Sequence, residues 1–269
     1  MDFLYSLPAA LLLVCALALA VAIAVAGQLF VHRRFRRADF VDHNEVGGVM
    51  IAVAGTLYAV ILGFMTVVCW EHFEQARQIV VAEADACIDA WHLSVGLPTT
   101  TRQRVRQDMI DYANIMAGTE WERMKHGAFD EKPAMISMDA IEAVGSVVPA
   151  NSGEANAQTA TMEQLTVLHD SRQRRIGENY SGVSWFEWVV LLGGAACIIG
   201  FCWLFGVRNT AIHLLMTSAV AVIIVCALVL LFELQYPFRS DIRIQPIAWR
   251  GAVAHINLMR SGEQTGMRM

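Results

Sequence analysis

The sequence predicts an all-α integral membrane protein in which a soluble helical bundle lies between two transmembrane hairpins. Four apolar stretches are each long enough to cross a bilayer, which requires about 20 residues in a helix. Residues 71–182 separate the second stretch from the third; they are polar and show the three- and four-residue spacings of amphipathic helices. No alternating strand pattern longer than a few residues occurs, so a β-sheet is not expected.

The apolar stretches predict transmembrane helices at residues 8–31, 47–70, 184–205 and 211–234. The alternative for the first is a cleavable signal peptide, because Ala22-Ile23-Ala24 resembles a small-residue cleavage site. However, residues 1–8 contain Asp2 and no Lys or Arg, and the apolar run is longer than the core of a signal peptide. We therefore expect this helix to be retained.

The second span is the most informative segment. Residues 47–70 carry no charge, and the pattern then becomes acidic and amphipathic through Arg77, with no Gly or Pro after Gly63 to stop a helix. We expect a single helix that continues from the membrane into water.

Residues 71–182 predict four helices. The first is broken by Gly96-Leu97-Pro98, and the second runs from Thr100 to near Gly127. A third is expected over residues 133–147 and a fourth over 158–180, after a loop at 149–156. The chain thus divides into a hairpin at residues 1–70, a soluble helical region at 71–182, a second hairpin at 183–234 and a C-terminal tail at 235–269.

Composition and charge exclude several functions. The net charge is −5, and residues 71–182 hold 17 acidic against 10 basic residues, so a nucleic-acid-binding surface is not expected. No phosphate-binding glycine loop, nucleophile elbow or zinc-protease helix occurs, and we expect neither an enzyme nor a cofactor. The clusters Trp70-Glu71-His72-Phe73-Glu74 and Glu120-Trp121-Glu122 are interpreted as solvated charged turns rather than metal sites.

Polar groups inside the spans are also few. Glu187 and Glu233 lie at helix ends, and His213 lies one turn into the fourth span. A proton-coupled transporter usually places such groups deep in its helices, so this class is disfavoured. Cys197 and Cys202 are interpreted as small packing residues rather than metal ligands.

Two ridges run along the second span. Gly55, Ala59 and Gly63 recur every four residues, the small-residue pattern that allows another helix to approach closely. The adjacent ridge consists of Thr56, Val60 and Phe64. In an oligomer, a ring of Val60 and Phe64 would form an apolar constriction, with Thr56 hydroxyls at one mouth. The alternative is that both ridges only pack or contact lipid.

Short motifs in a fixed order connect the sequence with a known family. They are His43-Asn44-Glu45-Val46-Gly47, Leu57-Tyr58-Ala59-Val60-Ile61-Leu62-Gly63-Phe64, Trp70-Glu71, Ala76, Glu83-Ala84, Tyr112, Glu120-Trp121 and residues 237–246 (Pro-Phe-Arg-Ser-Asp-Ile-Arg-Ile-Gln-Pro). With these motifs the chain resembles the bestrophin-like superfamily, and most closely its bacterial branch of four-span proteins of unknown function. The resemblance to true bestrophins is narrower, from Leu62-Gly63-Phe64 to Trp70, and at Arg106 and Tyr112-Ala113-Asn114.

Bestrophins are pentameric anion channels whose second helix lines a narrow apolar neck. The resemblance therefore implies a homo-oligomer, which in bestrophins is a pentamer, in the bacterial inner (plasma) membrane. It also implies that Thr56, Val60 and Phe64 lie at the neck and that inorganic ions pass through it. No counterpart of the calcium-sensing acidic cluster follows the fourth span, so calcium gating is not inferred.

Four spans place both termini and residues 71–182 on the same side of the membrane. The positive-inside rule compares the arginines on the two sides of the membrane. One side has Arg33, Arg34, Arg36, Arg37 and Arg208, and the other has seven arginines near span ends. The tight cluster at residues 33–37 favours an extracytoplasmic soluble region. The bestrophin resemblance implies the opposite, a cytosolic region, and we adopt that orientation because the domain order of a pore is harder to invert than loop composition.

Two functional hypotheses follow. The first is an oligomeric channel, passing anions, with the second span lining the pore. The second is a membrane-anchored helical scaffold or signalling protein without transport activity, in which the spans only anchor the chain. The mass of the detergent-solubilised particle separates the two, because a single chain or dimer cannot form a ring of second helices.

Overall fold

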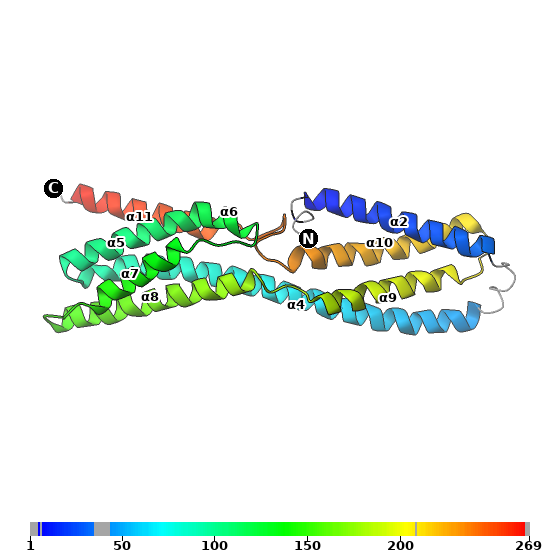
Figure 1. Cartoon of the computed structure of the whole chain (residues 1–269), viewed down its shortest axis with the longest axis horizontal. Coiled ribbons are helices and arrows are strands. Elements are labelled where there is room, and N and C mark those ends of the chain that lie inside the picture. The colour runs from blue at the N-terminus through cyan, green and yellow to red at the C-terminus, as the bar shows by residue number, and fades with distance from the viewer. Residues whose placement is uncertain (1–4, 6, 35–43, 208, 267–269) are drawn as a thin grey trace. The chain divides into compact units, whose positions relative to one another are not determined.

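The computed structural model describes residues 5, 7–34, 44–207 and 209–266, and these residues form helices and connecting turns without any strand. The principal helices are α2 (Ala9–Arg34), α4 (Asn44–Leu93), α5 (Thr99–Ile115), α7 (Lys132–Gly145), α8 (Ser152–Glu178), α9 (Trp185–Trp203), α10 (Thr210–Leu234) and α11 (Ile247–Gly266) (Figure 1). The shorter ones are the 3-10 turn η1 (Ser94–Gly96), the π-helix η2 (Met116–Glu120) and α6 (Trp121–Met124). The predicted all-α class is thus confirmed. His43, Arg36, Arg37 and Arg208 lie outside the described residues.

Four helices are long and apolar enough to cross a membrane, as the sequence predicts: α2, α4, α9 and α10. The second is one unbroken helix of 50 residues, so the apolar stretch does continue into the polar one without a stop. By contact the chain divides into two compact units. Unit 1 consists of Met1–His72, Gly182–Gln235 and Ser240–Ile242, and unit 2 of Phe73–Ser181, Tyr236–Arg239 and Arg243–Met269.

Unit 1 is assembled from the four apolar helices, and α2 packs against both α9 and α10. Close approaches at glycines fix this packing. The Trp203 indole lies against Gly27 of α2 and donates to the carbonyl of Ala24 at 3.0 Å. The Tyr58 ring lies against Gly194 of α9, and its hydroxyl donates to the carbonyl of Leu191 at 3.2 Å. A side chain at either glycine would occupy the space of the aromatic ring.

Polar groups at the span ends have local partners. Ser184 and Glu187 form a capping box that starts α9: the Glu187 carboxylate accepts from the N–H of Ser184 at 2.7 Å, and the Ser184 hydroxyl accepts from the N–H of Glu187 at 3.3 Å. Asn209 accepts from two backbone N–H groups at the start of α10. His213 is buried, and one ring nitrogen lies 2.9 Å from the carbonyl oxygen of Cys202. Glu233 is also buried. Neither ionisable group thus lies exposed along the lipid-facing surface of α10.

Unit 2 has one continuous hydrophobic core. Its large buried members include Met109, Tyr112, Met116, Leu165, Leu168, Phe238 and Trp249. In this unit α5 packs against α7 and α11, and α7 packs against α8. Residues 235–269, which the sequence analysis describes only as a C-terminal tail, supply α11. Trp249, Ala252 and Ile256 of that helix are buried at three- and four-residue spacing, so α11 belongs to the core.

The helix boundaries in unit 2 follow local capping. The second predicted helix ends near Gly127, whose φ of 70° is the left-handed conformation that glycine favours. The predicted loop at residues 149–156 is wrong in its second half, because α8 already begins at Ser152. The Asn151 side chain accepts from the N–H of Glu154 at 2.9 Å, and the Glu154 carboxylate accepts from the N–H of Ala150 at 2.8 Å. This reciprocal cap starts the helix six residues earlier than the turn-forming composition indicates.

The packing of Tyr58 on α9 can be tested with two adjacent glycines. A Cβ at Gly194 would lie 2.5 Å from the Tyr58 ring, whereas a Cβ at Gly193 meets nothing within 4 Å. We expect Gly194→Ala to lower the melting temperature of the detergent-solubilised protein, because Tyr58 must move and overpacking costs about 1–3 kcal/mol. Gly193→Ala should leave it unchanged or raise it, since Ala favours a helix. Equal melting temperatures for the two variants would contradict the observed contact.

Candidate pore wall and buried charge network

The three candidate pore residues lie on a face of α4 that no other part of the described chain covers. Val60 is 49% exposed and Phe64 is 70% exposed. The Thr56 hydroxyl donates to the carbonyl of Ala52 at 2.8 Å, the usual back-bond of a threonine in an apolar helix. The face of α4 that packs within the chain is a different one and contains Tyr58, Leu62 and Cys69, all buried.

The small-residue ridge is uncovered as well. An added Cβ at Gly55 or Gly63 would meet no atom within 4 Å, and Ala59 is exposed. Within one chain, therefore, this ridge does not receive a neighbouring helix. Both ridges of the second span are open to lipid or to a second copy, and their roles in packing and in a pore wall stay predictions.

Unit 2 contains a fully buried ion pair that joins α4 to α8. The Arg175 guanidinium of α8 donates to the Glu83 carboxylate of α4, with N–O distances of 2.6 and 3.2 Å. Tyr112 of α5 donates its hydroxyl to the same carboxylate at 2.6 Å. All three side chains are 0% exposed. One carboxylate thus ties together three helices that are far apart in the sequence.

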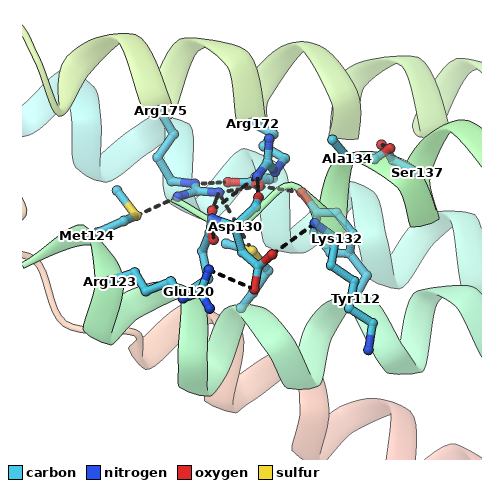
Figure 2. Close-up of polar contacts among 12 residues, drawn as sticks. Tyr112, Glu120, Arg123, Met124, Asp130, Lys132, Ala134, Ser137, Arg172 and Arg175 are labelled. Carbon is cyan, nitrogen blue, oxygen red and sulfur yellow. Dashed lines mark hydrogen bonds and ion pairs between the residues drawn. The ribbon is translucent and has the colours of Figure 1, made fainter. Parts of the chain in front are cut away.

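A second carboxylate extends this cluster. Glu120 of η2 lies 3.3 Å from Arg172 and 3.5 Å from Arg175, and it accepts from the backbone N–H of Asp130 at 2.6 Å. Arg172 also donates to the carbonyl of Asp130. Figure 2 shows Arg172 and Arg175 reaching from α8 toward Glu120 and Asp130. We call Glu83, Glu120, Arg172, Arg175 and Tyr112 the charge network.

The charge network is electrically balanced, with two carboxylates and two guanidinium groups that are at most 2% exposed. Burial alone would lower the pKa of Arg175, but the adjacent Glu83 carboxylate outweighs it and raises that pKa, so the guanidinium stays charged. Burial and the Glu83 charge raise the pKa of the Tyr112 hydroxyl well above its usual value, which keeps it a hydrogen-bond donor. The network holds helices together.

The sequence analysis missed this network and assigned Glu120 to a solvated turn, which is wrong because Glu120 is 0% exposed. Its neighbour Glu122 is exposed, as expected. The signal lay in the helical spacing. Leu165, Leu168, Arg172 and Arg175 follow one another at intervals of three, four and three residues, so the two arginines continue an apolar stripe.

Ionisable side chains elsewhere do not form a metal centre. Among the residues that the structure describes, no group of three His, Cys, Asp or Glu side chains is close enough to hold a metal ion. His92 and His255 face each other in unit 2, with 3.0 Å between their Nε2 atoms.

The apolar helices and the all-α architecture define a helical membrane protein with four candidate spans. More specifically, residues 18–249 match the model of the Bestrophin-like domain, and the chain belongs to this family. The resemblance in the sequence motifs is thereby confirmed. A search among curated proteins gave no match.

Solved structures agree with the family assignment at the level of fold. Two crystal structures of a bacterial bestrophin homologue from Klebsiella pneumoniae, each with one point mutation, resemble the chain with TM-scores of 0.67 and 0.66. Sequence identity is 12% and 13%, and in both cases 91% of this chain and 99% of the other chain are covered. The chain therefore has a bestrophin-like fold over nearly its whole length.

The charge network provides a test of unit 2. We expect Glu83→Gln to destabilise the protein by about 3–5 kcal/mol, because Arg175 would stay buried without its principal counter-ion. Tyr112→Phe should cost less, about 1–3 kcal/mol, since it leaves one acceptor site of Glu83 unfilled. The measurement is urea-dependent unfolding of the solubilised protein, followed by tryptophan fluorescence.

The control is Glu74→Gln. Glu74 forms an exposed pair with Arg77 three residues along α4, and such pairs contribute about 0–1 kcal/mol. If Glu83→Gln and Glu74→Gln had the same small effect, the buried pair would not stabilise unit 2.

Proposed function

We propose that the protein is a homo-oligomeric membrane channel that passes anions, with the second span lining the pore. The observation that carries the proposal is the uncovered face of α4, where Thr56, Val60 and Phe64 follow one another at four-residue spacing and the two apolar side chains are 49% and 70% exposed. Membership of the Bestrophin-like family supports it, because the resemblance to bestrophins implies anion conduction through such a helix.

The proposed constriction works by excluding water. A ring of Val and Phe side chains offers no hydrogen bonds, so a narrow passage between them empties of water and blocks ions. Thr56 lies one turn before Val60 and has a hydroxyl oxygen that could accept hydrogen bonds from water at the mouth. In this arrangement Phe64 and Val60 set the barrier to ions.

In the same proposal, unit 2 is the soluble part, and it lies with both termini in the cytosol. Its core is complete within the unit, and its buried arginines and carboxylates are paired with each other. A unit of this kind needs no lipid to satisfy its polar groups.

Widening the proposed constriction should increase ion flux. We expect Phe64→Ala and Val60→Ala, assayed in reconstituted vesicles by chloride efflux, to raise the rate several-fold, because a wider apolar ring holds water more readily. Ile61→Ala is the matched control. Ile61 is also an exposed apolar residue of α4, but it points about 100° away from Val60 and about 60° away from Phe64, toward the side of α4 that packs within the chain. Equal fluxes for Phe64→Ala, Ile61→Ala and the unmodified protein would refute a pore wall at this face.

The oligomer can be tested through the small-residue ridge. If a second copy packs on Gly63, Gly63→Leu should reduce the particle mass in mild detergent toward that of one chain, because the larger side chain prevents close helix approach. Gly193→Leu is the control, since Gly193 of α9 also has open space around it. A single chain for the unmodified protein would instead favour the membrane-anchored scaffold.

A further inference from the structure

Two histidines from distant parts of the chain are joined in unit 2 by a direct contact between their rings. His92 lies in the last turn of α4, and His255 lies in α11, 163 residues further along the chain. Their Nε2 atoms are 3.0 Å apart, and their ring centroids are 5.3 Å apart. These two distances fit rings that point at each other end to end, so the contact is a hydrogen bond between the two nitrogens.

This bond depends on how many protons the pair carries. A neutral imidazole has one N–H group and one lone pair, whereas an imidazolium has two N–H groups and no lone pair. The bond therefore forms when both rings are neutral or when one is protonated, because one nitrogen can still accept. When both rings are protonated, two N–H groups and two positive charges oppose each other. Histidine is the side chain that ordinarily changes its charge between about pH 5 and 8.

A buried neighbour fixes the His92 ring. The adjacent Trp91 is 2% exposed, and its indole meets the His92 ring edge-on with 5.1 Å between centroids. His92 itself is half-buried, whereas His255 is exposed. Protons from the solvent thus reach the pair on the His255 side, while the His92 ring keeps its place.

The charged groups near the pair come from α4 and α5. Asp89 precedes His92 by three residues, so the two lie on the same side of α4. From α5, the Arg106 guanidinium lies 4.1 Å from the centroid of the Trp91 ring, and Arg102 donates to the carbonyl of Val95 just after α4. The positions one turn from His255 on α11 are uncharged: Gly251, Ala252, Leu258 and Met259. The ionisable residue of η2, which also packs against α11, is Glu120 of the charge network.

The pair lies at the last point where α11 is anchored. Ile256 is 1% exposed, whereas all residues from Asn257 to Gly262 are exposed. Toward the other end of α11, Trp249 and Ala252 are buried in the core, so those turns do not depend on the histidines. Loss of the bond between the rings therefore loosens the turn around His255 and the exposed end beyond it.

We infer that the His92–His255 pair is a proton-sensitive latch between the end of α4 and the C-terminal helix α11. The latch holds while at most one ring is protonated and opens when both are. The closed pair binds fewer protons than two separated histidines, so lowering the pH favours the open state. Because α4 is the same helix that forms the second span, the latch connects α11 to the helix with the candidate pore residues. The latch itself does not depend on channel activity.

The experiment is amide hydrogen exchange of the intact solubilised protein, measured by mass spectrometry on peptides from residues 253–262 at about pH 7.5 and about pH 5. Each rate is divided into the intrinsic rate at the same pH, which gives a protection factor. We expect this factor to fall about three- to tenfold in acid, which corresponds to the loss of one hydrogen bond. His92→Leu should show the low value at both pH values, because leucine cannot bond to His255.

His92→Gln separates the latch from other effects of acid. The glutamine carbonyl oxygen accepts a hydrogen bond from the His255 ring whether that ring is neutral or protonated, so this variant should keep its protection in acid. The comparison is needed because burial raises the pKa of Asp108 of α5 to about 6. That carboxyl group titrates in the same interval in every variant, and its effect therefore cancels.

His126→Gln is the matched control, because His126 is an exposed histidine of unit 2 outside the pair, and it should lose protection in acid as the unmodified protein does. The inference is overturned if acid lowers the protection of the unmodified protein no more than that of His92→Gln. It is also overturned if His92→Leu is as well protected as the unmodified protein near neutral pH, since the pair would then not hold α11. Neither result bears on the proposed pore, because no ion flux is measured.

Discussion

The buried pairing of Glu83 with Arg175 is the interaction on which the architecture of unit 2 depends. Removing a carboxylate and a guanidinium from water is costly, and the cost is offset only when each finds partners at bonding distance. Arg175 has Glu83 and Glu120 within 3.5 Å, and Tyr112 completes the Glu83 carboxylate. These partners come from α4, α5, η2 and α8, so the pairing is satisfied only when all four elements are in register. Apolar packing alone would tolerate sliding of one helix along another.

Unit 1 is held together by different means, as its surroundings require. In lipid, apolar surface gives no driving force for helix association, so close packing and a few hydrogen bonds must suffice. The Tyr58 ring on Gly194 and the Trp203 ring on Gly27 serve this purpose, each with a hydrogen bond from the aromatic group to a backbone carbonyl. These contacts use one side of α4 and leave the side with Val60 and Phe64 uncovered. One face of α4 therefore packs against helices of the same chain, and the opposite side is left uncovered by the described chain.

The sequence predicted the features that depend on local pattern. Four spans, the unbroken second helix and the break at Gly96-Leu97-Pro98 all follow from runs of apolar residues and from helix breakers. It did not predict that Glu120 is buried, because a carboxylate beside Glu122 looks solvated until Arg172, 52 residues later, is brought next to it. It also left α11 as a tail, since Trp249 becomes a core residue only through contact with Tyr112 of α5, whose ring lies 5.5 Å away. The candidate pore residues could be named from spacing, and no other part of the described chain covers Val60 or Phe64.

The π-helix at Met116–Glu120 also determines which side of the helix the residues after it face. In a straight α-helix, five residues advance by about 500°, which would place Trp121 about 140° around the axis from Met116. Both side chains are nevertheless buried in one core, because the wider turn brings Trp121 back toward the side of Met116. A π turn is equivalent to one extra residue in an α-helix, so a bestrophin-like chain without it should align to this one with a single-residue gap between positions 116 and 120. Such a chain would carry its equivalent of Trp121 on another side of the helix, away from the Ile244 carbonyl to which the Trp121 indole donates here.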